Sequence, residues 1–286
     1  MLLKTFRQLC ICPRPVFCTR PYSGGSMLFT GSGQVTLQQN DATGIAVVTL
    51  DNPGKKNALS GSMMVQLEDI VQKLEKWDDG KAVIVTGNGH DFCSGGDLEF
   101  IRKILNKQGG QKMCTHMQGM LTKLKNLPLI SVASICGLAL GGGAELCTAC
   151  DFRLITESAK IGFVQLKMGL ATGFGGGTRL TKIIGRSEAI KLLCSGKVLK
   201  AEECLKIGLV DGIISNQDEH IAYTTEWIQS NFPHDSSLTR KMKEIIVGAT
   251  ELDEQNSLAN EKEIFVQTWS SPLHVDAVNS NIKHKE

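Results

Sequence analysis

Apolar residues cluster in short runs over the first two thirds of the chain, and these runs predict β-strands. Residues 35–39 and 45–50 flank a turn-rich segment and predict a hairpin. Residues 82–86 and 129–136 are almost entirely apolar, which is typical of strands buried on both faces, and residues 152–156 predict one more strand.

Helical spacing of apolar residues appears between the strands. Met63, Leu67, Ile70, Leu74 and Trp77 recur every three or four positions, so we expect a helix that Ser60 or Ser62 caps. Further helices are expected over residues 98–107, 113–127, 180–184, 188–193 and 201–207, and from residue 219 to the end. The pattern therefore predicts an α/β fold that ends in helices.

One apolar run is long enough to imitate a membrane span, because residues 127–144 carry no charge. Pro128 and three glycines interrupt the run, and Glu145 closes it. A buried strand that turns into a helix explains this pattern better than a membrane span does.

Two glycine turns follow apolar strands and carry the candidate chemistry. Gly142 lies in a triple glycine at a strand-to-helix junction, where we expect a helix to open near Leu146, and Glu145 lies one turn further along. Gly96 lies in the other turn, before Asp97, which can cap a helix that starts at the next residue. Backbone N–H groups at such turns stabilise a negatively charged oxygen, so the pair predicts an oxyanion site beside a carboxyl group.

The motifs around these turns resemble the enoyl-CoA hydratase/isomerase superfamily, the crotonases, over roughly residues 33–286. They are NPGKKNAL at 52–59, FCSGGDL at 92–98, GLALGGGAE at 137–145, CDFR at 150–153, GGGTRL at 175–180 and AEECLKIGLV at 201–210. The resemblance implies a ββα superhelix with a C-terminal helical oligomerisation region. It also implies that the N–H groups of Gly96 and Gly142 bind the carbonyl of a coenzyme A thioester, and that Glu145 is one of two catalytic glutamates.

The second glutamate expected from this resemblance is absent, and Gln165 takes its position. Glutamine cannot exchange a proton as a carboxylate does, which argues against hydration and isomerisation. Loss of CO2 from a malonyl-type thioester needs no base, only stabilisation of the enolate and one proton, for which Glu145 and a water molecule are the candidates. A hydratase or isomerase with another base, and a non-catalytic binding protein of the same fold, are the alternatives.

Further motifs resemble a decarboxylating branch of the superfamily that acts on ethylmalonyl-CoA and, less well, methylmalonyl-CoA, as metabolite repair. They are GSMMVQLE at 61–68, LEKW at 74–77, LPLISVA at 127–133, GAELCTACDFRL at 143–154 and KMG at 167–169. Thr172 and Phe174 lie in a turn that departs from the Ile-Pro sequence usual in the superfamily, and we expect them to shape the acyl pocket.

Several polar residues near the glycine turns have two interpretations. The resemblance places Lys55 and Lys56 near the coenzyme A phosphates, but both also suit a solvated loop. Ser94 either contacts the substrate or holds its turn, and His90 is expected to be an ordinary loop residue. Arg179 is expected to be structural, paired with Asp151 or Glu188.

Composition excludes several other classes of function. The chain has 286 residues, 42% of them hydrophobic, and a net charge of +2 without a basic stripe, so no nucleic-acid partner is expected. Ten cysteines lack disulfide or metal spacing, and the pair Cys147 and Cys150 suits core packing in a reducing compartment. We expect no metal and no cofactor beyond the coenzyme A of the substrate.

Three segments are predicted. Residues 1–32 form a basic segment without acidic residues, which resembles a mitochondrial transit peptide or a disordered tail; residues 33–218 form the core; residues 219–286 are helical. The family resemblance favours the cytosol, with the mitochondrial matrix as the alternative. It also implies that the last helices assemble a homotrimer or a hexamer.

Overall fold

A six-stranded sheet forms the centre of the molecule in the computed structural model, which describes residues 29–280. Its order is β1-β2-β3-β4-β6-β9. The predicted hairpin is confirmed, with β1 (Gln34–Asn40) antiparallel to β2 (Ile45–Asp51). The next strands run parallel to β2, and they are β3 (Ala82–Gly87), β4 (Ile130–Ile135), β6 (Phe152–Thr156) and β9 (Gly212–Ile214).

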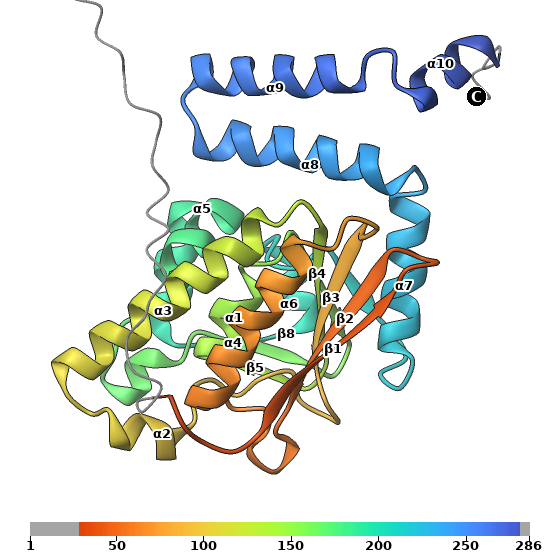
Figure 1. Ribbon diagram of the computed structural model, residues 1–286. Helices are drawn as coiled ribbons and strands as arrows, with labels where there is room; N and C mark the ends of the chain where they lie inside the picture. Colours follow the sequence, from red (N-terminus) through yellow and green to blue (C-terminus); the bar gives the residue numbers. More distant parts are fainter. Residues whose placement is uncertain (1–28, 281–286) are drawn as a thin grey trace, which may run out of the picture.

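Helices cover both faces of this sheet, which explains why β3 and β4 are apolar at nearly every position. On one face, α1 (Gly61–Glu75) and α3 (Lys107–Asn126) lie side by side over the strands (Figure 1). On the other face, α7 (His220–Asn231) buries Ile228 against Ile84 and Val132. The predicted helix over 63–77 is confirmed, and Ser60 caps it by accepting from the Met63 N–H over 3.3 Å.

A second, three-stranded sheet lies beside the first, in the order β5-β7-β8. Its strands have three residues each, so their apolar patterns are too short to predict, and they are β5 (Leu138–Leu140), β7 (Lys160–Gly162) and β8 (Val198–Lys200). The short elements η1 (Pro53–Lys55), η2 (Gln165–Met168), α4 (Gly142–Cys147) and α6 (Ala201–Lys206) connect the strands.

Several helix boundaries differ from the prediction. The helix α2 ends early (Leu98–Lys103), and α3 begins at Lys107 because Asn106 accepts from the Gly109 N–H. Gly109 therefore lies inside the first turn of α3 rather than between two helices. The two helices expected over 180–193 form one element, α5 (Gly176–Ser195), which is kinked where Gly185 adopts φ 76°.

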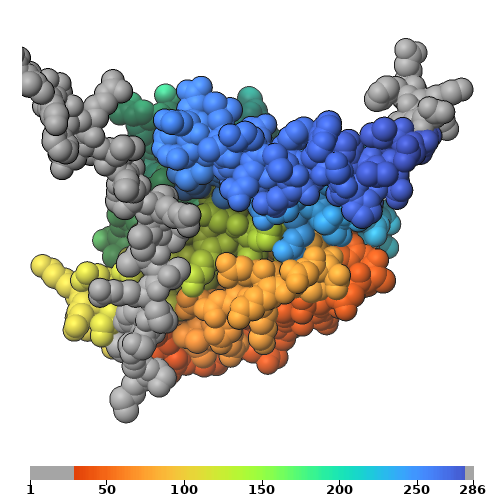
Figure 2. Space-filling view, turned by 45° about the horizontal axis from the view of Figure 1, so that its top comes forward, coloured from red at the N-terminus to blue at the C-terminus, as the bar shows by residue number. Residues whose placement is uncertain are grey.

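The C-terminal part is helical as predicted, and its outer helices lie away from the sheet. Helix α8 (Ser236–Glu251) is followed by α9 (Glu254–Thr268), which packs on α8, and by α10 (Pro272–Asn279). They form a ridge along one side of the molecule, shown in blue in Figure 2. Trp269, at 59% exposure, and Phe265, at 54%, are the largest of their exposed apolar side chains.

None of the helices within residues 29–280 has the length and apolar character that a membrane crossing requires. The predicted leader segment lies mostly outside the described residues. The division of the chain at residues 32 and 218 stays a prediction, although α7, from the predicted C-terminal segment, packs directly on the central sheet.

Candidate active site

The two predicted glycine turns lie against each other. The Cys93 N–H donates to the Leu138 carbonyl and the Leu140 N–H donates to the Cys93 carbonyl, both over 2.9 Å, so the segment before the first turn pairs with β5. A Cβ atom placed on Gly95 would lie 3.5 Å from the Gly142 nitrogen. Strand-like pairing therefore brings both turns to one point, although they are more than forty residues apart in the chain.

The amide groups of Gly96 and Gly142 have no hydrogen-bond acceptor among the described residues. Their neighbours are paired, since the Asp97 N–H donates to the Leu59 carbonyl and the Gly141 N–H donates to the Gly162 carbonyl. Gly96 and Gly142 are also partly exposed, whereas Gly141 is buried. Two free donors in adjacent, partly exposed turns are what an oxyanion site requires.

The second turn begins its helix earlier than expected. Gly141 adopts φ 53°, which ends β5, and α4 starts at Gly142 rather than near Leu146. The Glu145 N–H donates to the Gly141 carbonyl over 3.0 Å, so Glu145 belongs to the first turn of α4. Free N–H groups are an ordinary property of a first helical turn, which explains why the Gly142 amide is available.

Close packing requires glycine at the second turn. A Cβ atom on Gly142 would lie 2.7 Å from the ring of Phe174, and one on Gly143 would lie 2.1 Å from the Cys93 carbonyl oxygen. The ring of Phe174 therefore lies directly beside a candidate oxyanion donor. That Phe174 shapes an acyl pocket stays a prediction.

Glu145 is buried, with 2% of its surface exposed, and accepts four hydrogen bonds. The N–H groups of Phe174 and Gly176 donate to Oε1 over 2.8 Å each. The Gln165 side-chain amide donates to Oε2 over 2.9 Å, and the Gly173 N–H donates to Oε2 over 3.4 Å. Four donors thus converge on one carboxyl group, so Glu145 fixes the 173–176 turn in this arrangement.

The side-chain amide of Gln165 has a hydrogen-bond partner at its nitrogen and none at its oxygen. Its Nε2 donates to Glu145, and its Oε1 is buried without a partner among the described residues. The opposite amide orientation would place Oε1 against the carboxylate oxygen of Glu145, so the network fixes which end faces outward. Gln165 therefore carries a buried acceptor to which no described residue donates.

Arg179 is structural, as expected, but its expected partners are wrong. Its guanidinium donates to the carbonyls of Phe174, over 2.7 Å, and Glu145, over 3.2 Å, and to the Thr148 hydroxyl. Burial lowers the pKa of Arg179, and the nearby Glu145 charge opposes that shift. The acids expected as its partners pair elsewhere, Asp151 with Lys243 and Glu188 with Lys191.

Two residues of α3 support the same turn, and sequence reasoning missed them. Gln118 donates to the Gly173 carbonyl over 2.8 Å, and the thiol of Cys114 lies 2.9 Å from where a Cβ of Gly173 would be. The two positions are four residues apart, so they share one helix face. The four-residue spacing indicates in the sequence that the two side chains share a helix face, but it does not indicate which segment that face contacts. Thr172 is half-buried beside this turn, with its hydroxyl 3.0 Å from a Cβ placed on Gly177.

The two lysines predicted to contact the coenzyme A phosphates, Lys55 and Lys56, differ in their surroundings. Lys55 forms ion pairs with Asp97, over 2.9 Å, and Glu99, over 2.8 Å, and these pairs raise its pKa. Lys56 is exposed and forms no ion pair with the described residues. The Ser94 hydroxyl donates to the Lys55 carbonyl over 3.0 Å and so holds the first glycine turn.

Other predicted features lie outside this cluster. His90 is exposed on its loop. Cys147 and Cys150 are buried and free, and burial raises the pKa of each thiol to about 12, in agreement with core packing. Within residues 29–280, no three His, Cys, Asp or Glu side chains are grouped as a metal site would require.

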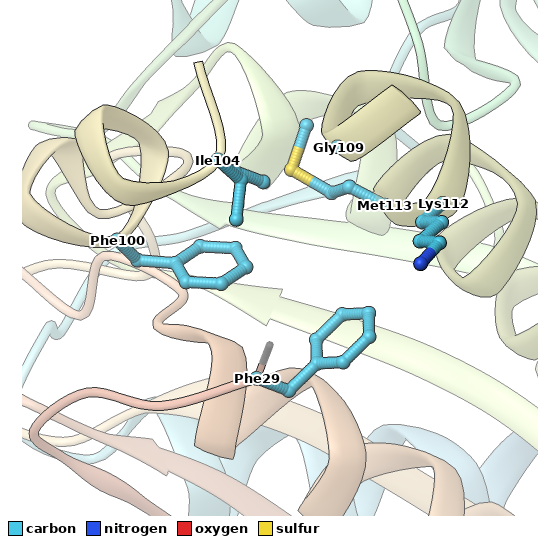
Figure 3. A pocket seen from close by; sticks show the side chains of 6 residues that line it. All are labelled: Phe29, Phe100, Ile104, Gly109, Lys112 and Met113. Carbon is cyan, nitrogen blue, oxygen red and sulfur yellow. The ribbon is translucent and has the colours of Figure 1, made fainter. Parts of the chain in front are cut away.

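A small apolar cavity of about 10 Å³ lies between α2, α3 and Phe29. Figure 3 shows the rings of Phe29 and Phe100 facing the side chains of Ile104 and Met113 around it. A cavity of this size is at the lower limit for one water molecule and cannot hold a thioester. The junction of the two glycine turns is the candidate site because of its free N–H groups and the buried Glu145.

The structure brings six of the nine predicted site residues into one connected cluster. They are Gly96, Gly142, Glu145, Gln165, Thr172 and Phe174. Lys55 and Ser94 hold the first turn in place, because Lys55 binds Asp97 and Ser94 donates to the Lys55 carbonyl. Lys56, the next residue after Lys55, is exposed.

Comparison with known proteins identifies the family. The chain is 44% identical to ethylmalonyl-CoA decarboxylase of Xenopus laevis over 258 residues, covering 90% of this chain and 86% of that protein. It is also 44% identical to ethylmalonyl-CoA decarboxylase of Danio rerio, covering 88% and 85%. The crystal structure of enoyl-CoA hydratase from Bacillus anthracis superimposes with a TM-score of 0.79 at 26% identity, covering 86% and 95%, which confirms the predicted crotonase fold. The family model for enoyl-CoA hydratase/isomerase matches residues 40–278, and the chain belongs to that family.

Proposed function

We propose that this protein decarboxylates malonyl-type acyl-CoA thioesters, with ethylmalonyl-CoA as the main substrate and methylmalonyl-CoA as a second one. The observation that carries the proposal is the pair of free N–H groups on Gly96 and Gly142, together with Gln165 at the position where a hydratase needs a second carboxylate. The activity named for its 44% identical relatives supports the same reaction.

The reaction follows from these groups. The bond between the α-carbon and the carboxylate breaks, CO2 leaves, and its electron pair passes to the thioester as an enolate. The N–H groups of Gly96 and Gly142 bind the enolate oxygen, and each such donor contributes roughly 3–4 kcal/mol in enzymes where one was removed. A proton then adds to the α-carbon. The thioester itself accepts the electrons, so the reaction needs no cofactor besides the coenzyme A of the substrate.

Hydration of an enoyl-CoA fits the site less well. It requires one group that takes a proton from water and one that delivers a proton to carbon. Gln165 can do neither, and Glu145 accepts four hydrogen bonds that hold the 173–176 turn. A non-catalytic binding role leaves the two free donors without a purpose.

A product assay tests the proposal. Purified protein is incubated with ethylmalonyl-CoA, methylmalonyl-CoA and crotonyl-CoA, and the acyl-CoA products and CO2 are quantified by mass spectrometry. We expect one butyryl-CoA and one CO2 per ethylmalonyl-CoA consumed, and little hydration of crotonyl-CoA. Efficient hydration without CO2 release would overturn the proposal and favour a hydratase.

We also propose that the ridge formed by α8, α9 and α10 assembles the chain into a homotrimer, or a hexamer of two trimers. Met242, Leu258, Phe265 and Trp269 are each more than half exposed on these helices, and burying such side chains favours association. Light scattering coupled to size exclusion should give three or six times the chain mass of 31.0 kDa. A mass of 31.0 kDa at micromolar concentration would contradict the assembly.

The cellular setting is a further part of the proposal. We propose metabolite repair in the cytosol, with the mitochondrial matrix as the alternative that the basic N-terminal segment suggests. Lys56 is exposed, carries no ion pair among the described residues, and accepts a hydrogen bond from the Ser94 N–H of the first turn over 2.9 Å, and we assign it to the coenzyme A phosphates.

A further inference from the structure

Gln165 carries a buried acceptor for which the protein supplies no donor. Its Oε1 has no partner among the described residues, and its Nε2 is held by Glu145 over 2.9 Å. Buried polar atoms nearly always have a hydrogen-bond partner, either a protein group or an ordered water molecule. The question is therefore which molecule donates to Oε1.

The acyl part of the proposed substrate cannot donate this hydrogen bond. A malonyl-type thioester presents a carbonyl oxygen and two carboxylate oxygens, all of which accept hydrogen bonds. A water molecule can donate one hydrogen to Oε1 and still has a second hydrogen to give. Water is therefore the donor that matches both the protein and the substrate.

Gln165 is linked to the oxyanion site through Glu145 and Phe174. Gln165 binds Oε2 of Glu145, and the N–H of Phe174 binds Oε1 of the same carboxylate. The ring of Phe174 lies against Gly142, one of the two donors for the thioester oxygen. One contiguous set of contacts thus connects the Gln165 acceptor to the oxyanion site.

We propose that Gln165 positions the water molecule that protonates the enolate, with Glu145 fixing the amide of Gln165; this inference rests on the proposed decarboxylation. After CO2 leaves, an O–H bond of the water breaks and a C–H bond forms at the α-carbon. The hydroxide left behind takes up a proton from the solvent, so the products are the saturated thioester and CO2, and one solvent proton is consumed per turnover. Gln165 is a positioning residue, because it acts through the water.

A fixed water delivers its proton to one face of the enolate, and this property provides the test. Ethylmalonyl-CoA is converted in deuterium oxide, and the configuration of [2-²H]butyryl-CoA is determined by NMR with a chiral derivative. For the native protein, we expect one deuterium in a single configuration. For Gln165→Met, which keeps the side-chain length but has no acceptor, we expect both configurations and a kcat lower by roughly 10²-fold, a typical contribution of positioned proton transfer.

The exposed Gln72, on α1, offers a matched control, and Gln72→Met should keep the native stereochemistry and kcat. A mixture of configurations from the native protein, or a single configuration from Gln165→Met, would overturn the inference. The native result needs no variant, so the inference stays testable even where Gln165→Met does not fold. Absence of CO2 release from the native protein would instead contradict the proposed function.

Discussion

The Gln165 amide donates to the Glu145 carboxylate over 2.9 Å, at a place where the hydratase pattern has two glutamates. Two carboxylates at this distance repel each other unless they share a proton. The amide replaces that repulsion with a hydrogen bond, so Glu145 is held as an acceptor for the 173–176 turn. The pair of Gln165 and Glu145 therefore distinguishes this site, which suits stabilisation of an enolate, from a hydratase site with two glutamates.

Restoring the second carboxylate should change the reaction. We expect Gln165→Glu to lower decarboxylation of ethylmalonyl-CoA at least tenfold, because a group that helps positioned proton transfer typically contributes 10²–10⁴-fold. Hydration of crotonyl-CoA should rise above the native level, since a base and an acid then face each other. Rates on both substrates check this, and a folded variant whose two rates equal those of the native protein would show that Gln165 does not determine the reaction.

Glu145→Gln should weaken both activity and stability. A glutamine at this position presents an NH2 group to N–H donors, so buried donors on Phe174, Gly176 or Gln165 lose their acceptor. Each unsatisfied donor costs about 1–3 kcal/mol. We expect a similar fall in the free energy of unfolding, measured by urea denaturation, and a kcat/KM lower by about 10²-fold, on the basis of roughly 1.4 kcal/mol per tenfold.

The exposed pair of Glu188 and Lys191 offers the control Glu188→Gln, which should change neither quantity. Native stability in Glu145→Gln would be incompatible with its four hydrogen bonds.

The contact between Gly142 and the ring of Phe174 can be tested by adding one methyl group. In Gly142→Ala, the new Cβ meets the ring at 2.7 Å, so the turn or the ring must move. We expect kcat/KM to fall by about 10- to 100-fold, since overpacking costs about 1–3 kcal/mol. Adding Phe174→Leu should recover part of the loss.

A control for that substitution exists in α3. A Cβ on Gly119 meets no atom within 4 Å, so Gly119→Ala should leave kcat/KM unchanged. If Gly142→Ala were as active as Gly119→Ala, the ring would not lie beside the donor.

His220 gives the protein a pH-dependent stability that is separate from the site. It is buried between α7 and β4, where its Nδ1 lies 2.8 Å from the Ser134 hydroxyl, and burial lowers its pKa. The unfolded chain binds a proton on this residue below about pH 6.5, while the folded chain resists it. The free energy of unfolding should therefore fall with decreasing pH below about 6.5, by at most about 1.4 kcal/mol per pH unit.

Urea denaturation at pH 7.5, 6.5 and 5.5 checks this dependence. The variant His220→Asn should reduce the loss between pH 7.5 and 5.5, whereas His234→Asn, at an exposed position, should not. Equal pH dependence in the native protein and in His220→Asn would assign the effect to other groups.

Short-range patterns predicted the hairpin, the buried strands, helix α1 and its cap, because each depends on a repeat of a few residues. They did not predict the start of α4 at Gly142, which depends on the φ of 53° at Gly141 and on pairing with the distant residue Cys93. The free N–H groups were predictable as glycine turns. That the two turns lie together was predictable only through the family resemblance, because nothing in the sequence pattern shows that Cys93 pairs with Ala139.

The partners of buried polar groups were the hardest to predict. Arg179 binds backbone carbonyls rather than an acid, and Gln118 reaches the Gly173 carbonyl from α3. Backbone acceptors have no signature in the sequence, so charge pairing alone suggested the wrong partners for Arg179. Lys55 shows the same limit, since its ion pairs with Asp97 and Glu99 join η1 to the start of α2, which only the fold brings together.

The carbonyl stretching frequency of a bound thioester tests most directly whether Gly96 and Gly142 hold one oxygen. Butyryl-CoA labelled with ¹³C at the thioester carbonyl is bound to the protein, and its band is isolated by infrared difference spectroscopy against the unlabelled ligand. Two convergent N–H donors polarise the C=O bond, so the band should lie at a lower frequency than that of the same thioester in water. A band at the frequency in water, or above it, would contradict the oxyanion site.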